Sequence, residues 1–338
     1  MQTYQLTFRA PLHIGERGVG LEESRTTVAA DTLFSALCVM WRELYGKEAL
    51  EDLLLQFTDS AQQPKPFHLT SAFPVAGAVR FFPRPCVAIP TKAPKALRRV
   101  QFVSENIFKQ IVQGAAPEFS AGDCLNGGET WLDAGERRAL QPWATSEGIV
   151  LWRKQVVPRV TLDRLTSASS IWRCGSVVFA ESHTGETAGL WFAAQVRDDV
   201  KARFEAALRL LGDAGLGGER SAGYGLFSFK ALSANALPSA AQTEHFITLS
   251  PCAPADGTET GALLQGAQVS YELLPRRGWV GSVEAGNLRR KQVWMLREGA
   301  VLRGAPRFAG RLALVTPELS THPVWRYGWA FPVGVNLS

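Results

Sequence analysis

Five glycines fall within eleven residues in the run GLGGERSAGYG, at positions 215–225. An amphipathic helix precedes the run, because apolar side chains recur at helical spacing from Val200 to Leu211, and the strand-like segment LFSF follows it. So many glycines between a helix and a strand indicate left-handed backbone or a very close backbone approach. An extended helix C-cap is the alternative interpretation. A Walker loop is excluded because no Gly-Lys-Ser/Thr follows, and a dinucleotide fingerprint because the run does not open a helix.

The N-terminal segment predicts a strand and then a helix. Apolar and polar residues alternate over 4–9, which is typical of a half-buried strand. An apolar stripe at helical spacing follows between residues 33 and 45. We expect Asp31 and Thr32 to cap the free amides of this helix, and Gly46 to end it.

The remaining elements predicted within the first 235 residues indicate an α+β fold. Residues 149–179 read as a long hairpin with a polar tip, and residues 190–196 as a further strand. With the later helix and the strand LFSF, the order becomes β-α-β-β-α-β, which is the ferredoxin-like architecture of RNA-recognition modules. The proline-rich residues 60–100 predict irregular structure with short strands, and residues 100–141 an insertion or loop.

A linker rich in Ala, Ser and Pro covers about 232–242, and the rest of the chain reads mostly as strands. We therefore expect an N-terminal domain over 1–235 and a smaller C-terminal domain over 236–338. With 338 residues the chain is long enough for two domains of ordinary size.

Composition narrows the functional classes. The five cysteines are scattered without a CxxC pair, which argues against a zinc site and a disulfide framework and favours a cytoplasmic protein. No secretion signal and no apolar stretch long enough to span a membrane is present in the sequence. No residue pattern in the sequence indicates a binding site for a metal or a cofactor. The formal net charge is only +5, so the distribution of charge matters more than its sum.

Three segments concentrate positive charge beside hydroxyl or aromatic residues, a combination typical of nucleic-acid surfaces. The hairpin tip carries Arg153, Lys154, Arg159 and Arg164 among threonines and serines. Residues 276–311 hold nine Lys or Arg against two Glu, with Trp279 and Trp294 interleaved, and residues 80–109 hold seven against one. A solvated hairpin and ordinary basic faces are the competing interpretations.

His13, in LHIGERGVGLEES, is the one histidine beside a glycine loop. It could act as a general base in RNA cleavage. No second acid–base partner is evident, and a lone histidine at the end of a strand is more often packed or hydrogen-bonded.

These segments resemble a known family. The run LHIGERGVGLEESRTTVAADTLFSALC is similar to the N-terminal signature of subunit four of type III-A CRISPR (Csm) effector complexes, and GLGGERSAGYGLF to the glycine-rich loop of the RAMP superfamily. PRVTLDRLTSASSIW resembles the thumb hairpin of that family. YELLPRRGWVGS, WMLREGAVL and HPVWRYGWAFPV resemble its C-terminal pattern. The similarities cover nearly the whole chain in the same order, except residues 110–148.

The resemblance implies two ferredoxin-like (RRM-like, RAMP) domains with a thumb β-hairpin at about 150–180 and a Gly-rich loop at 215–225. It implies a non-catalytic, Cas-five-like subunit that grips the repeat-derived 5′ tag of the crRNA. The implied partners are that crRNA, the large Cas-ten subunit and the backbone RAMP subunit, with no membrane and no cofactor. The implied RNA-binding residues are Gly217, Gly218, Glu219, Arg220, Ser221, Gly223, Tyr224, Arg159, Arg164, Thr166, His13 and Arg25.

Two alternatives stay open at this stage. Some RAMP relatives are metal-independent endoribonucleases that process guide RNA, and such a role would use His13 as the base. The chain could also be the equivalent subunit of a type III-B or III-D complex, although the WRYGWAFPV pattern favours type III-A.

Overall fold

The first strand of the chain lies inside a sheet and not at its edge. In the computed structural model, which describes residues 1–15, 22–59, 64–232, 237–240, 243–281 and 288–337, β1 (Gln2–Phe8) pairs antiparallel with β12 (Gly189–Val196) and β13 (Phe227–Leu232). The strand β12 then pairs with β3 (Phe73–Ala76) and β2 (Phe67–Leu69). The order β13-β1-β12-β3 is that of a ferredoxin-like sheet, which confirms the predicted β-α-β-β-α-β arrangement.

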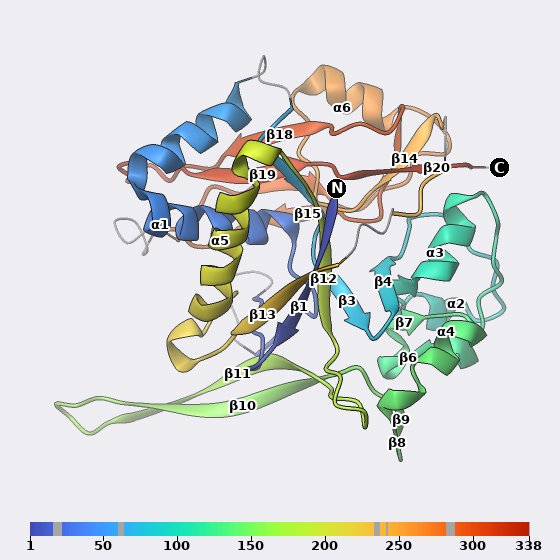
Figure 1. The fold of residues 1–338 in the computed structure, drawn as a ribbon, viewed down its shortest axis with the longest axis horizontal. Helices are drawn as coiled ribbons and strands as arrows, with labels where there is room; N and C mark the ends of the chain where they lie inside the picture. The colour runs from blue at the N-terminus through green and yellow to red at the C-terminus, as the bar shows by residue number, and fades with distance from the viewer. Residues whose placement is uncertain (16–21, 60–63, 233–236, 241–242, 282–287, 338) are drawn as a thin grey trace.

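Two helices pack on this sheet and on each other, α1 (Ala30–Thr58) and α5 (Asp198–Ala214) (Figure 1). The apolar stripe of α5 reaches the sheet at Phe204, whose ring lies 5.8 Å from that of Tyr4. Tyr4 also stacks on Phe192 of the neighbouring strand, with 5.2 Å between ring centroids. The strand β1 is buried on both faces and not half-buried as expected, because Thr3 and Gln5 are covered as well.

Gly46 does not end the first helix. Its backbone turns out of helical geometry at φ 85° and ψ 174°, and the helix resumes as far as Thr58. Glycine therefore marks a kink inside α1, since a left-handed φ interrupts the hydrogen-bond ladder without ending the element.

The central sheet continues past β3, first through residues where we expected short strands and then through residues 100–141, where we expected an insertion or loop. The added strands are β4 (Val79–Pro83), β5 (Phe102–Ser104), β7 (Thr130–Trp131) and β6 (Cys124–Leu125). The helices beside them are α2 (Pro94–Leu97), α3 (Glu105–Val112) and α4 (Ala134–Ala139), with 3-10 turns at Ala121–Asp123, Asn126–Gly128 and Gln141–Trp143 and a small ribbon of β8 (Ala144–Thr145) and β9 (Gly148–Ile149).

Residues 100–141 therefore form a structured insertion, which was one of the two expected alternatives, and not a loop. Phe108 and Trp131 of this region are almost completely buried in the main apolar core. Most of these elements are two to six residues long, which is too short for periodicity to be visible in the sequence. The helix α3 is longer, and its buried residues Ile107, Phe108, Ile111 and Val112 were a helical pattern that we did not recognise.

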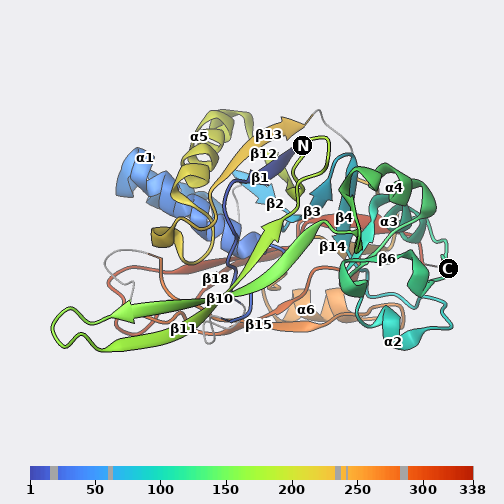
Figure 2. The same ribbon diagram turned by 90° about the horizontal axis from the view of Figure 1, so that it is seen from below.

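The predicted hairpin is confirmed as β10 (Trp152–Leu162) and β11 (Ser169–Phe179), which we call the thumb. Figures 1 and 2 show that it leaves the body of the molecule and projects away from it. Trp172 and Thr161 join its strands through a hydrogen bond from the indole Nε1 to Oγ1 at 3.1 Å.

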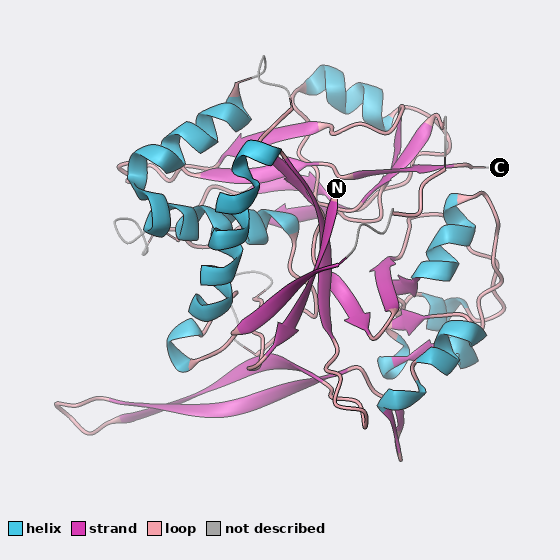
Figure 3. Ribbon diagram, viewed as in Figure 1, coloured by secondary structure: helices cyan, strands magenta, loops and turns pink. Residues whose placement is uncertain are grey.

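The C-terminal part is rich in strands, as expected, and confirms the α+β class (Figure 3). Its small sheet has β14 (His245–Thr248) between β17 (Val301–Arg303) and β20 (Pro332–Val335). Two ribbons, β15 (Leu273–Arg276) with β16 (Val293–Leu296) and β18 (Gly310–Leu314) with β19 (Trp325–Trp329), and helix α6 (Gly257–Leu264) complete it.

One apolar core joins the N-terminal and C-terminal parts. Tyr327 is completely buried, lies 5.1 Å from Phe34 between ring centroids, and accepts a hydrogen bond from the Leu69 amide at 3.0 Å. The expected boundary at 235/236 falls outside the described residues, so its position stays a prediction.

Within the described residues, no helix is long and apolar enough to cross a bilayer.

Candidate nucleic-acid interface

The Gly-rich loop is a series of tight turns that begins where α5 ends. Gly215 takes φ 84° directly after the last helical residue, and a single 3-10 turn, η4 (Arg220–Ala222), follows. Glu219 precedes η4 in the left-handed region at φ 57°, and its carbonyl accepts a hydrogen bond from the Ala222 amide at 2.9 Å. Arg220, Ser221 and Gly223 are exposed on the outer side of this turn.

The inner side of the loop packs on His13. The Gly218 amide donates to the His13 carbonyl at 2.9 Å. A Cβ at Gly217 would lie 2.3 Å from that carbonyl oxygen, and one at Gly218 would lie 2.7 Å from Cδ2 of the His13 ring. These two glycines are therefore required by the protein's own packing, whatever meets the outer side of the loop.

His13 itself joins three segments. Its side chain is only 3% exposed, and its Nδ1 lies 2.6 Å from the carbonyl oxygen of Gly175 in the thumb strand β11. Since a carbonyl can only accept, Nδ1 carries a proton. Gly175 in turn has the carbonyl of Glu22 against it, 2.1 Å from where a Cβ would stand. The base of the thumb, the N-terminal segment and the Gly-rich loop thus form one packed junction.

The thumb also contacts the loop through Arg159 and Tyr224. The Arg159 guanidinium lies 4.9 Å from the centre of the Tyr224 ring, within range of a cation–π interaction. A hydrogen bond to Tyr224 raises the pKa of Arg159 above its ordinary value. The structure therefore brings together Arg159, Tyr224 and His13, which lie far apart in the sequence.

Arg164 and Thr166 lie elsewhere, at the thumb tip. The carboxylate of Asp163 accepts hydrogen bonds from the amides of Leu165 and Thr166 at 2.8 and 2.9 Å, which closes the tip and lowers the pKa of Asp163. The tip is remote from the Gly-rich loop in both views (Figures 1 and 2). The predicted thumb residues are therefore divided between the Gly-rich loop, where Arg159 lies, and the tip, where Arg164 and Thr166 lie.

Arg25 lies beside the base of the thumb. It lines a groove of about 730 Å³ together with Lys154, Gly175 and Arg297. Its amide donates to the Ile14 carbonyl at 3.0 Å, so the backbone of this segment is tied to the residue that follows His13.

Many cations that the sequence suggested for RNA contact are paired within the protein. Lys154 lies 2.5 Å from Glu129 and Arg153 3.3 Å from Glu147. The same holds for Arg80 with Glu105, Arg276 with Asp31, Arg297 with Glu272 and Arg307 with Glu259. The basic runs in the sequence thus overstate the positive charge available at the surface.

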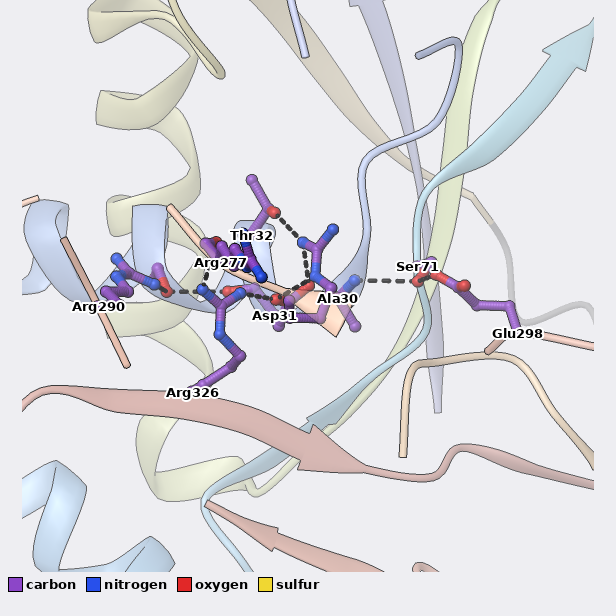
Figure 4. A network of polar contacts seen from close by, with 10 residues as sticks. Ala30, Asp31, Thr32, Ser71, Arg277, Arg290, Glu298 and Arg326 are labelled. Atoms are coloured by element: carbon purple, nitrogen blue, oxygen red, sulfur yellow. Dashed lines mark hydrogen bonds and ion pairs between the residues drawn. The ribbon is translucent and has the colours of Figure 1, made fainter. Parts of the chain in front are cut away.

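Asp31 does not cap α1 as expected. The N-cap is Ala29, and the Ala30 amide instead donates to the Ser71 hydroxyl at 2.9 Å, which itself donates to Glu298 at 2.6 Å (Figure 4). Asp31 is completely buried one position further on, where its carboxylate receives hydrogen bonds from other parts of the chain.

Two arginines from the C-terminal part converge on this carboxylate. Arg276 binds it through Nε and Nη2 at 2.9 and 2.7 Å, and Arg326 binds Oδ2. Burial alone would raise the pKa of Asp31, but the two guanidinium charges outweigh it and lower the pKa to about 2. Asp31 therefore stays ionised and fixes the start of α1 against β15 and β19.

A second hollow of about 280 Å³ lies between α1, the Gly-rich loop and the segment around Trp279. Sequence reasoning missed it. Thr32 and Ser35 line it from the first turns of α1, and Arg290 lines it from the C-terminal part. The spacing of Thr32 and Ser35, three residues apart, indicates in the sequence that both lie on one face of the helix. The sequence did not indicate that Arg290 lies beside them.

The described residues contain no group of three or more His, Cys, Asp or Glu side chains that could hold a metal ion.

Two protein-family models match this chain. The RAMP superfamily model matches residues 5–228, and the CRISPR Csm4 C-terminal domain model matches residues 241–335. A protein of Thermococcus onnurineus, "CRISPR system Cms protein Csm4", is 27% identical over 325 residues, which cover 91% of either chain. A Mycobacterium tuberculosis protein of the same description is 27% identical over 318 residues, 93% of this chain and 91% of its own.

Solved structures agree at the level of the fold. The crystal structure of a Csm3-Csm4 subcomplex of the type III-A CRISPR-Cas interference complex matches with a TM-score of 0.66 at 16% identity, covering 99% of this chain and 100% of that one. A Csm1-Csm4 cassette in complex with cA4 matches with a TM-score of 0.56 at 20% identity, covering 100% and 98%. The chain therefore belongs to the RAMP superfamily, and its residues 241–335 match the model of the Csm4 C-terminal domain.

Proposed function

We propose that this protein is a non-catalytic crRNA-binding subunit of a type III-A CRISPR interference complex and that it grips the 5′ tag of the guide. The observation that carries the proposal is the junction between thumb and Gly-rich loop. There Arg159 lies on Tyr224, while Arg220, Ser221 and Gly223 are exposed beside it. Exposed cations and hydroxyls on a packed junction suit the sugar-phosphate backbone of RNA.

We extend the proposal to the protein partners of this chain. The structural relatives are Csm4 chains bound to Csm3 or to Csm1, by their descriptions. By analogy we propose that this chain docks the large Cas-ten-type subunit and a backbone RAMP subunit, at the foot of a complex that acts in the cytoplasm against invading nucleic acid.

The rival function is guide-processing endoribonuclease, and the position of His13 argues against it. The ring is almost completely buried, and its Nδ1 is hydrogen-bonded to the Gly175 carbonyl. A general base must come within hydrogen-bond reach of the proton it removes. We expect the purified chain to leave repeat RNA intact during incubation with EDTA, as seen on a denaturing gel. Cleavage at one defined position would favour the nuclease.

The tag-binding proposal is tested at Arg220. Arg220→Ala is expected to weaken crRNA binding by about ten- to a hundredfold, because a hydrogen bond to a charged group contributes about 1.5–3 kcal/mol. In assembled complexes the 5′ tag should become accessible to nuclease. The melting temperature should hardly change, since the side chain is exposed and, among the described residues, has no hydrogen-bond or ion-pair partner.

Lys201→Ala is the matched control. It removes one exposed cation from the opposite end of α5, about 20 Å along the helix from the loop. RNA affinity should stay close to that of the unmodified chain. Equal losses in the two variants would mean that the loop has no special role and that only net charge matters.

A further inference from the structure

The hollow of about 280 Å³ between α1, the Gly-rich loop and the Trp279 segment has the chemistry of a ligand pocket. Two cations line it, Arg220 and Arg290, and no carboxylate is among its described lining residues. Thr32 and Ser35 contribute hydroxyl groups from α1. Its remaining side chains are apolar or aromatic and are contributed by Ile14, Ala36, Val39, Leu216 and Trp279.

The electrostatics of the pocket favour an anion. Arg290 donates from Nη1 to the Ser35 hydroxyl at 3.2 Å, while its buried Nε has no partner among the described residues. The Asp31 carboxylate attracts Arg290 but already binds Arg276 and Arg326. Burial, followed by repulsion from Arg326, lowers the pKa of Arg290 to about 10, so it is still a cation at neutral pH. Arg290 thus keeps a charged, buried Nε–H group without an acceptor among the described residues, and a bound phosphate would supply one.

Trp279 supplies a flat surface for a base. Its side chain is 47% exposed, and the Arg289 guanidinium lies 4.7 Å from the ring centre. Trp279 is held in place by the backbone, because it forms a bridge with Arg289, and the Arg290 amide donates to the Gly278 carbonyl at 2.9 Å. Aromatic rings positioned beside cations bind unstacked bases of single-stranded nucleic acid.

We propose that this pocket takes one unstacked nucleotide of the guide RNA, with the base on Trp279 and the phosphate at Arg290. The inference rests on the proposed function and adds to it a defined subsite. A free nucleoside phosphate has the same chemistry as one nucleotide of RNA. The RNA source is favoured because Arg220 lines the pocket and also belongs to the exposed loop next to Arg159 and Tyr224, so a strand on the loop can continue into the pocket.

The test uses the full chain and a synthetic copy of the RNA that co-purifies with the assembled complex. 2-Aminopurine replaces one base at a time, since its fluorescence is quenched when it stacks. One position should be strongly quenched on binding. Trp279→Ala should restore the fluorescence at that position alone and weaken binding by about tenfold, the loss expected for one base–aromatic stack.

Two further variants make the result specific. Val39→Phe fills the pocket from α1 and should abolish the quenching as Trp279→Ala does. Trp294→Ala is the control, because Trp294 is 56% exposed in the same part of the chain but does not line the pocket. It should leave both quenching and affinity unchanged. Melting curves check that each variant is folded.

Three outcomes would overturn the inference. Normal RNA affinity without quenching at any position would contradict the proposed nucleotide pocket but would agree with tag binding. Trp279-dependent binding of adenosine or uridine 5′-monophosphate, with no quenched RNA position, would make it a site for free nucleotides. Failure of the unmodified chain to bind the guide RNA at all would contradict the proposed function and the subsite together.

Discussion

Asp31→Asn is expected to lower the free energy of unfolding by about 3–5 kcal/mol, the cost of removing one partner from a buried ion pair. Asn keeps the shape of the side chain but removes the charge that Arg276 and Arg326 both face. Arg326 would then lie buried without a counter-ion among the described residues. Denaturation in urea, followed by circular dichroism, measures the change.

Asp213→Asn is the control for this substitution. Asp213 pairs with Arg9 at 3.1 Å, but both side chains are more than half exposed, so solvent screens the pair. Its loss should change the free energy of unfolding by less than about 1 kcal/mol. Similar effects at both aspartates would mean that the Asp31 cluster contributes no more than a surface pair.

The stability from Asp31 should also depend on pH with a defined sign. Its folded pKa is lowered to about 2, below the unfolded value of about 3.9, so the folded state favours the ionised carboxylate. The contribution is complete above about pH 4 and is lost as the pH falls toward about 2. The stability difference between the unmodified chain and Asp31→Asn should therefore shrink over this interval. A constant difference would show that the charge of Asp31 is not the cause.

Gly217→Ala is expected to destabilise the chain by about 3 kcal/mol or more. The backbone has φ 97°, which is unfavourable for any residue with a Cβ, and the added carbon would lie 2.3 Å from the His13 carbonyl oxygen. That oxygen belongs to backbone that also binds the Gly218 amide, so relieving the clash means moving the junction. The melting temperature of the free chain should drop, and RNA binding should fall with it.

Gly223→Ala is the matched control on the same loop. Its φ is 81°, but a Cβ there would meet nothing within 4 Å. Gly223→Ala should lower the free energy of unfolding by only about 1–2 kcal/mol, the energy of left-handed backbone in a residue with a Cβ. If Gly217→Ala lowers the free energy of unfolding no more than Gly223→Ala does, the packing of the loop on His13 does not stabilise the chain.

The features that the sequence predicted correctly are those with a local signature. Alternation defined β1, and an unbroken pair of strand-like runs defined the thumb. The stripe from Val200 to Leu211 defined α5, and the glycines after it marked the turns. Each of these depends on residues close together in the chain, where periodicity and turn chemistry act directly.

The features that failed depend on distant residues. Asp31 looked like a cap because its partners, Arg276 and Arg326, are 245 and 295 positions away. The basic runs looked available for RNA because the acids that pair with them lie in other segments, as Glu129 does for Lys154. The pocket at Trp279 depends on α1 packing against the C-terminal part, which no local pattern specifies.

The central place of β1 has a consequence for how the chain is made on the ribosome. Residue Thr3 pairs with Leu232, so the first strand emerges long before the strand that borders it is synthesised. Its other neighbour, β12, also arrives late, and Tyr4 must wait for Phe192 and Phe204. Until then a strand with apolar side chains on one face and two unpaired edges is present in the nascent chain, which is a state prone to aggregation. Folding of the first sheet is therefore completed only after the chain has been synthesised as far as β13.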